Sequence, residues 1–484
     1  MLRRALPAGA TIVGVAAVLR AVFDPWYLNY DARYAILWSR DAWTGHLPEY
    51  EADFAPTPKP LQSLVGSIGL PFGDLADDVM TWIVLLSLGV LAYLVFLLGA
   101  RLFGNPWVGV VAAAVVVTRP VILRDTLLAY QDIPFAALIV GAVLLEAERA
   151  RRGVPVLVVL FFAGLLRPEA WVLAGLYWLY LWPASSPRRR LALAALVAAA
   201  PILWALTDLI VTGDPLHSLH GTAELAEENE RRRSITQVPR WGAQYVAYTL
   251  REPLILGVPA GLLFAWLYRR RDRSTWLSLA VAAAMLVVFA IGPIFGLPLI
   301  GRYVRTPAIL LALFYGLAVA GWMLLPRGSR ERRVWMAVGA VALLASLAFV
   351  PVKHVEMLQG LDERFERDGR FYADLREVGN APAVERAFAA CGGKLSTAEH
   401  RPIPYIRWWL DGDPGSVGTI RKRTSPLSEL LLIPRDVRHV RRFYRSNYPR
   451  RTARRPPGWK TIYSNRTWKV YAAPSCPGAA TGRR

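Results

Sequence analysis

The sequence has few of the residues that usually build metal or redox sites. Among 484 residues there are two cysteines, Cys391 and Cys476, and six histidines. No Cys-x-x-Cys pair and no cysteine–histidine ligand cluster is present, which argues against a zinc site. Lysine is also scarce, since only six of the 57 basic residues are lysine, whereas Ala, Gly and Pro are plentiful. That composition is typical of a bacterium with a GC-rich genome. There is no internal repeat and no low-complexity tract.

The sequence also lacks the regular mixing of polar and apolar residues that a soluble protein shows. Hydrophobic residues make up 54% of the chain, and its mean hydropathy is +0.31. They come in long blocks separated by short arginine clusters, the pattern of a polytopic membrane protein. The net charge of +21 would suggest nucleic-acid binding in a soluble protein. In a membrane protein, basic residues first set orientation and lipid contact.

The apolar blocks predict about eleven membrane-spanning helices, because a span needs about 20 apolar residues, or fewer when it is buried among others. The predicted spans are 5–23, 80–100, 106–118, 133–147, 154–166, 170–183, 191–211, 253–268, 275–291, 307–325 and 334–350. The first could be a signal peptide, since Arg3 and Arg4 precede it. It has no convincing small-residue cleavage site, so we interpret it as a membrane anchor.

Arginine clusters predict the orientation. We place the protein in the plasma (inner) membrane with its N-terminus in the cytoplasm. Five consecutive inner turns then carry arginine, as the positive-inside rule requires. Residues 154–183 could form one broken span around Arg167-Pro168-Glu169. That reading would place Arg188 to Arg190 outside, so we prefer two short spans joined by an outer turn.

This orientation predicts two domains: residues 1–350 in the membrane, with a first outer loop at 24–79, and residues 351–484 outside the cytoplasm. The first loop carries nine acidic and three basic residues, and the tail carries a net charge of +13. In the tail we predict helices at 353–376 and 383–390, a strand at 428–433, and a hairpin of 460–463 with 467–472. The basic face of this small α/β domain would bind anionic lipid or cell-wall polymer, or remain a solvated surface.

The predicted extracytoplasmic location of the tail favours a disulfide between Cys391 and Cys476. The alternative is two unrelated buried thiols.

The remaining polar residues of interest collect at the outer ends of the predicted spans. They are Asp31 and Lys59 in the first outer loop; Arg124, Asp125, Tyr130 and Asp132 in the second; Arg167 and Glu169 in the third; and Arg302, Tyr303 and Arg305 in a late one. Acids and arginines from loops far apart in sequence, all predicted at one membrane face, indicate a site for an anionic group at the interface.

These loops resemble those of the GT-C glycosyltransferases, polytopic enzymes that use polyprenyl-phosphate sugars and include the protein O-mannosyltransferase-like and aminoarabinose transferase-like enzymes. The resemblance rests on YDARYAILW, GHLPEY and TPKPLQ in the first loop, RDTLLAYQDIPF in the second and GRY at 301–303. It covers roughly residues 1–350, and it implies an all-α membrane domain with a catalytic aspartate at Asp31 and a match at Asp132. Many members carry two adjacent acids in the first loop, whereas here Asp31 is followed by Ala32.

The chemistry of such a reaction can be stated from the residues alone. Sugar transfer from a phosphate to a hydroxyl requires a carboxylate that takes the acceptor's proton and cations that stabilise the departing phosphate. We predict Asp31 as the base, Lys59, Arg302 and Arg124 as phosphate-binding residues, and Asp132 as a residue that orients the acceptor. Mg2+ or Mn2+ bound by Asp31 and Asp132 would also be compatible with carboxylate ligands.

Further substrate contacts are predicted at Tyr130, Arg167, Glu169 and Tyr303.

Each candidate also has a purely structural interpretation. Asp31 and Asp132 could cap the helices that follow them. Lys59 could extend to the interface, Arg302 could anchor to lipid headgroups, and Arg167 could simply pair with Glu169.

The sequence therefore predicts a cell-envelope glycosyltransferase (a hexosyl- or pentosyltransferase). It would move a sugar, with inversion, to an extracytoplasmic protein, lipid or glycan acceptor. The alternatives are a transporter or flippase of lipid-linked sugars without catalysis, and an anchored scaffold.

Overall fold

The computed structural model describes residues 2–23, 27–349, 353–420, 427–435 and 455–477. It divides into two compact units, each described here by itself. The first comprises residues 1–23, 59–62 and 78–361, and the second comprises 24–58, 63–77 and 362–484. The domain boundary predicted at residues 350 and 351 lies outside the described residues. Most of the predicted first outer loop belongs to the second unit, together with the C-terminal region.

The first unit is helical. Its helices, including α4, which begins just outside it, are α1 (Leu2–Val22), α4 (Ala76–Phe103), α5 (Pro106–Thr118), α6 (Pro120–Leu127), α7 (Asp132–Glu148), α8 (Val154–Gly164), α9 (Glu169–Leu181), α10 (Pro187–Thr212), α11 (His217–Glu228), α12 (Val238–Leu250), α13 (Glu252–Arg269), α14 (Leu277–Ile291), α15 (Arg305–Ala320) and α16 (Arg330–Phe349). Short 3-10 turns occur at η2 (Trp182–Ala184), η3 (Ile235–Gln237), η4 (Arg273–Trp276), η5 (Gly292–Phe295), η6 (Gly301–Val304) and η7 (Gly321–Leu324).

Each of the eleven predicted apolar blocks coincides with a helix, including α8 and α9, which are separate helices as expected. Among the described residues, four helices are long and apolar enough to cross a membrane. A fifth span results if α5 and α6, which meet at a 61° bend, are counted as one. Several others are short, such as α8. The chain is thus a multi-pass membrane protein, while the number eleven stays a prediction.

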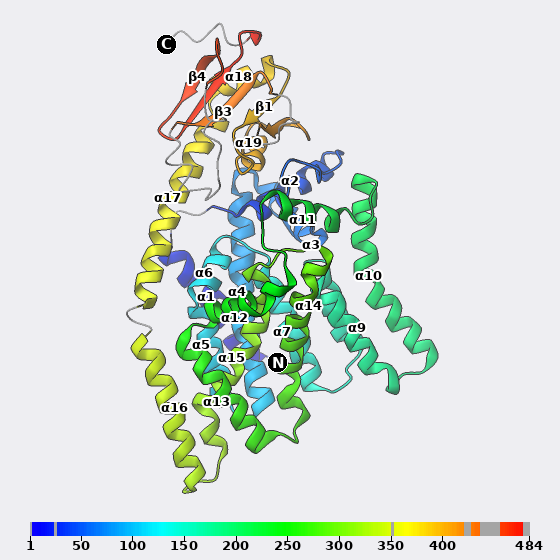
Figure 1. Ribbon diagram of the computed structural model, residues 1–484, viewed down its shortest axis with the longest axis vertical. Coiled ribbons are helices and arrows are strands. Elements are labelled where there is room, and N and C mark those ends of the chain that lie inside the picture. The colour runs from blue at the N-terminus through cyan, green and yellow to red at the C-terminus, as the bar shows by residue number, and fades with distance from the viewer. Residues whose placement is uncertain (1, 24–26, 350–352, 421–426, 436–454, 478–484) are drawn as a thin grey trace. The chain divides into compact units, whose positions relative to one another are not determined.

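Helix α15 lies at the centre of the first unit. It packs against α5, α13, α14 and α16 (Figure 1), and its side chains are buried along almost its whole length. Glycines allow this close approach: a Cβ at Gly261 of α13 would lie 1.7 Å from the carbonyl oxygen of Phe314, and one at Gly316 would lie 2.4 Å from that of Val108. Small residues at helix contacts are the usual means of packing in membranes.

The second unit contains a five-stranded sheet. Its strands are β1 (Leu395–Thr397), β2 (Val417–Thr419), β3 (Leu430–Pro434), β4 (Lys460–Ser464) and β5 (Trp468–Ala472), in the order β2-β1-β3-β5-β4. Strands β1, β2 and β3 run parallel, and β5 pairs antiparallel with β3 and β4. The predicted hairpin and β3 are confirmed. The three-residue strands β1 and β2 were not predicted, because they are too short to show a periodic pattern.

Helices α17 (Val355–Gly379), α18 (Pro382–Ala390) and α19 (Ile403–Trp409) accompany the sheet, and α18 packs against β4 (Figure 1). The same unit holds α2 (Tyr30–Trp43), most of α3 (Pro60–Gly66) and η1 (Leu70–Leu75). Helix α19 packs on α2, and the Tyr405 hydroxyl donates to the Leu28 carbonyl at 2.7 Å. The acidic first loop and the basic tail are therefore partners in one folded unit.

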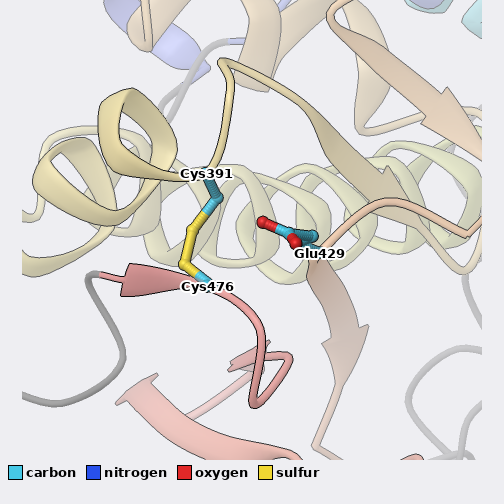
Figure 2. Close-up of side chains that lie close together, drawn as sticks. All are labelled: Cys391, Glu429 and Cys476. Carbon is cyan, nitrogen blue, oxygen red and sulfur yellow. A yellow bond between two sulfur atoms is a disulfide. The ribbon is translucent and has the colours of Figure 1, made fainter.

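The two cysteines lie at the edge of this sheet. Figure 2 shows Cys391, at the end of α18, joined to Cys476 by a disulfide, with Glu429 beside them. Their Cα atoms are 5.2 Å apart. These three side chains are close enough together to suggest a metal site. Since the two sulfurs are bonded to each other, they offer no thiolate to a metal.

Candidate functional site

The best candidate site forms where three helix junctions of the first unit meet. Asp132 is the first residue of α7, Arg167 lies in the turn between α8 and α9, and Arg302 lies in η6 immediately before α15. An apolar helix begins or ends at each of these positions. The three polar side chains therefore lie close together at the helix ends. The sequence predicted that these loops share one face, and the structure brings their side chains into contact.

Asp132 is the centre of this group. One of its carboxylate oxygens accepts from Arg167 Nη1, and the other lies 3.7 Å from Arg302 Nη1. Arg167 also pairs with Glu169, as predicted for these two residues. We name Asp132, Arg167, Glu169 and Arg302 the junction cluster.

Aromatic rings stack on the two arginines of the junction cluster. The guanidinium carbon of Arg302 lies 4.6 Å from the ring centroid of Tyr130, and that of Arg167 lies 4.7 Å from that of Tyr303. Burial alone would lower the pKa of Arg167, but Glu169 and Asp132 raise it, so the guanidinium stays charged. Six predicted site residues thus come together. Planar guanidinium groups bind phosphate through paired N–H donors. Arg302 is the partly exposed arginine of the cluster, whereas the N–H groups of Arg167 already bind Asp132 and Glu169.

A second buried ion pair lies on neighbouring elements. Asp125 is fully buried and accepts from Arg124 Nε and Arg305 Nε, both at 3.0 Å, while Arg305 Nη1 donates to Thr249 Oγ1 at 2.7 Å. Arg124, predicted to hold phosphate, is thus committed to a carboxylate, although 27% of its side chain is exposed.

Lys59 belongs to the same unit as the junction cluster. Its segment is joined to the α8–α9 turn, since the Leu61 amide donates to the Leu165 carbonyl at 3.2 Å, two residues before Arg167. The Leu61 side chain packs on the core formed by α7, α8 and α9. The Lys59 side chain itself is half-buried.

Asp31 lies in the second unit, in the first turn of α2. It is not the cap of this helix, because Asn29 holds that position and its side chain accepts from the Ala32 amide at 3.1 Å. The capping interpretation of Asp31 therefore does not apply. Asp132 likewise does not cap α7: the N-cap is Gln131, and the Asp132 carboxylate contacts arginines instead.

The surroundings of Asp132 do not favour a divalent metal there. Both of its carboxylate oxygens face guanidinium groups, which neutralise the charge that Mg2+ or Mn2+ would need. We therefore assign Asp132 to orienting arginines, and no step below depends on a metal.

Sequence reasoning missed the residues that join the first loop to the tail. Arg407 of α19 is fully buried and pairs with Asp41 and with Glu49 at 3.2 Å, while Arg40 pairs with Asp411 at 3.0 Å. The signal was available, because a loop rich in acids and a tail rich in arginine have complementary charge.

Known proteins similar to this chain are found among solved structures. No protein-family model and no curated protein matches the sequence. Among solved structures, the chain is similar to ArnT from Cupriavidus metallidurans bound to undecaprenyl phosphate, with a TM-score of 0.54 and 15% identity over 98% of both chains.

The same protein in its apo state has a TM-score of 0.50 at 15% identity, covering 97% of this chain and 98% of that one. An oligosaccharyltransferase from Archaeoglobus fulgidus, in complex with Zn and sulfate, also has a TM-score of 0.50 at 15% identity. This match covers 84% of this chain and 62% of the oligosaccharyltransferase chain. Identity this low shows the fold alone. The predicted resemblance to GT-C glycosyltransferases is therefore confirmed at the level of the fold.

Proposed function

We propose that the protein is a glycosyltransferase that takes a sugar from a polyprenyl-phosphate donor and passes it, with inversion, to an acceptor outside the cytoplasm. The observation that carries this proposal is the junction cluster, in which a partly exposed arginine, Arg302, is held at a helix end beside Asp132. It occurs in a fold shared with a protein crystallised with undecaprenyl phosphate.

In this proposal Arg302 and Lys59 hold the donor phosphate and stabilise the charge that develops as the sugar leaves. Arg302 is the accessible arginine of the cluster, because 24% of its side chain is exposed against 6% for Arg167. Asp132 and Glu169 keep Arg167 charged and fix its plane, while Tyr130 and Tyr303 stack on the two guanidinium groups.

Asp31 is proposed as the general base that removes the acceptor's proton. It stands in the first turn of a well-packed helix whose cap is supplied by another residue, so its carboxylate is not required for capping. Arg124 is proposed to form a structural ion-pair network with Asp125 and Arg305 and not to contact the phosphate directly.

The test is turnover of undecaprenyl-phosphate sugars by the purified full-length chain, measured by mass spectrometry. Asp31→Asn is expected to lower kcat by roughly 10²–10⁴-fold, the usual contribution of general base catalysis. Arg302→Ala and Lys59→Ala are expected to lower kcat/KM about 10²-fold or more, and Arg302→Lys to restore only part of it.

Arg240→Ala, an exposed arginine of α12, is the matched control and should retain full activity. Turnover that survives both Asp31→Asn and Lys59→Ala, at normal protein levels, would remove these assignments. Movement of a lipid-linked sugar across liposome membranes with no change in its chemistry would instead favour the flippase alternative.

A further inference from the structure

A second group of cationic side chains gathers at another helix junction of the first unit. Arg119 connects α5 to α6, Arg251 connects α12 to α13, and His354 precedes α17. Arg119 and His354 are 4% and 8% exposed. We name these three residues the cationic pocket.

The three residues are linked by contacts of neighbouring groups and by their electrostatic interaction. Arg119 Nη1 donates to the Leu250 carbonyl at 3.3 Å, next to Arg251, and Arg251 Nη2 contacts Met357 Sδ at 2.7 Å, three residues beyond His354. Both arginines act electrostatically on His354 and, together with burial, lower its pKa to about 4. The imidazole is therefore neutral near pH 7.

Arg119 has no carboxylate partner among the described side chains. Its Nε donates to the Val115 carbonyl and its Nη2 to Thr118 Oγ1, both at 3.2 Å. With the bond to Leu250, three of its five N–H groups are used. The buried Nε2 of His354 likewise has no hydrogen-bond partner among the described residues. A buried cation without a carboxylate partner and a buried polar atom without a hydrogen bond are costly, and a bound anion is one way in which both are satisfied.

The backbone supports the same conclusion. Arg251 has φ 68° and ψ 165°, a conformation that is essentially confined to glycine. Strain of this kind persists where the surrounding structure requires a side chain at one position, and it concentrates at binding sites.

We propose that the cationic pocket binds an anionic phosphate group, as a diester in a lipid headgroup or as the free ion. It is formed by residues other than those proposed to hold the sugar donor. Arg119 would supply two N–H donors, Arg251 a charge, and His354 a third donor through Nε2.

The experiment measures the melting temperature of the full-length chain in dodecyl maltoside micelles, which contain no phosphate. One arm adds phosphatidylglycerol to the micelles, and the other adds inorganic phosphate. We expect stabilisation in at least one arm, and the arm identifies the source of the phosphate. Arg119→Gln and His354→Gln should each weaken phosphate binding on the order of ten- to a hundredfold, the usual loss for one charge-assisted hydrogen bond.

Arg119→Lys keeps the charge and should retain part of the binding, and Arg240→Gln should behave as the wild type. If Arg119→Gln does not fold, His354→Gln alone decides. Equal stabilisation of wild type and His354→Gln in both arms, or none in either, would overturn the proposal.

Discussion

Two buried ionic networks, one in each unit, differ in how much of them solvent can reach. In the junction cluster of the first unit, Arg302 and Glu169 expose 24% and 16% of their side chains. In the second unit, Arg407 exposes 0%, and its partners Asp41 and Glu49 expose 3% and 20%. We name these three residues the clasp. Both networks join elements far apart in sequence with similar residue types. They differ at the arginine, since Arg302 of the junction cluster is partly exposed whereas Arg407 of the clasp is fully buried.

Burial in the second network disfavours the charged forms of its carboxylates. Burial raises the pKa of Asp41 even though Arg407 is bound to it, and it raises the pKa of Glu49 as well. Desolvation on this scale is offset only while all partners are present. We therefore expect loss of stability when a member of this clasp is changed, and loss of turnover when a member of the junction cluster is changed.

The largest expected effect is from Arg407→Ala. Leaving the carboxylates of Asp41 and Glu49 buried without their partner should lower the free energy of unfolding of the second unit by about 3–5 kcal/mol. The control is Arg466→Ala, since 66% of the Arg466 side chain is exposed in its pair with Asp374, so its loss should cost less than about 1 kcal/mol. Limited proteolysis and thermal unfolding measure both. An equal loss of stability in the two variants would show that the buried Arg407 pairs contribute no more to stability than an exposed pair.

The next effect concerns the disulfide. Replacing Cys391 and Cys476 by serine should cost the second unit roughly 2–5 kcal/mol, because the bond closes a long loop with a sequence separation of 85. Dithiothreitol should lower the melting temperature of the wild type and leave that of the serine variant unchanged. A wild type that is insensitive to the reductant would favour two separate thiols.

The smallest effect concerns His354 of the cationic pocket. The pKa of His354 is lowered to about 4 in the folded chain, against about 6.5 when unfolded. Between these values the unfolded state binds more protons, so stability is lost as the pH falls from about 6.5 to about 4. The loss is at most about 3–4 kcal/mol, since one pKa unit corresponds to about 1.4 kcal/mol.

Unfolding of the wild type and of His354→Gln in phosphate-free dodecyl maltoside micelles, followed between pH 7 and pH 4, measures this effect. The variant should lose less stability than the wild type across this range. Parallel curves would show that His354 does not titrate in this way.

The sequence by itself determined the local features. Every predicted apolar block is a helix, the Arg167–Glu169 pair forms as expected, and the β4–β5 hairpin turns where its residues predicted. These outcomes depend on composition, periodicity and near neighbours, which are present in the order of the residues.

Only the tertiary structure decided which distant charges meet. Asp132 contacts Arg302 across 170 positions, Arg407 reaches Asp41 across 366, and Arg119, Arg251 and His354 converge from three junctions. Charged residues at helix ends have many partners of suitable sign, and the packing of the helices selects among them. The physical reason is that apolar burial positions the helices, whereas ion pairs form between the ends that this burial brings together.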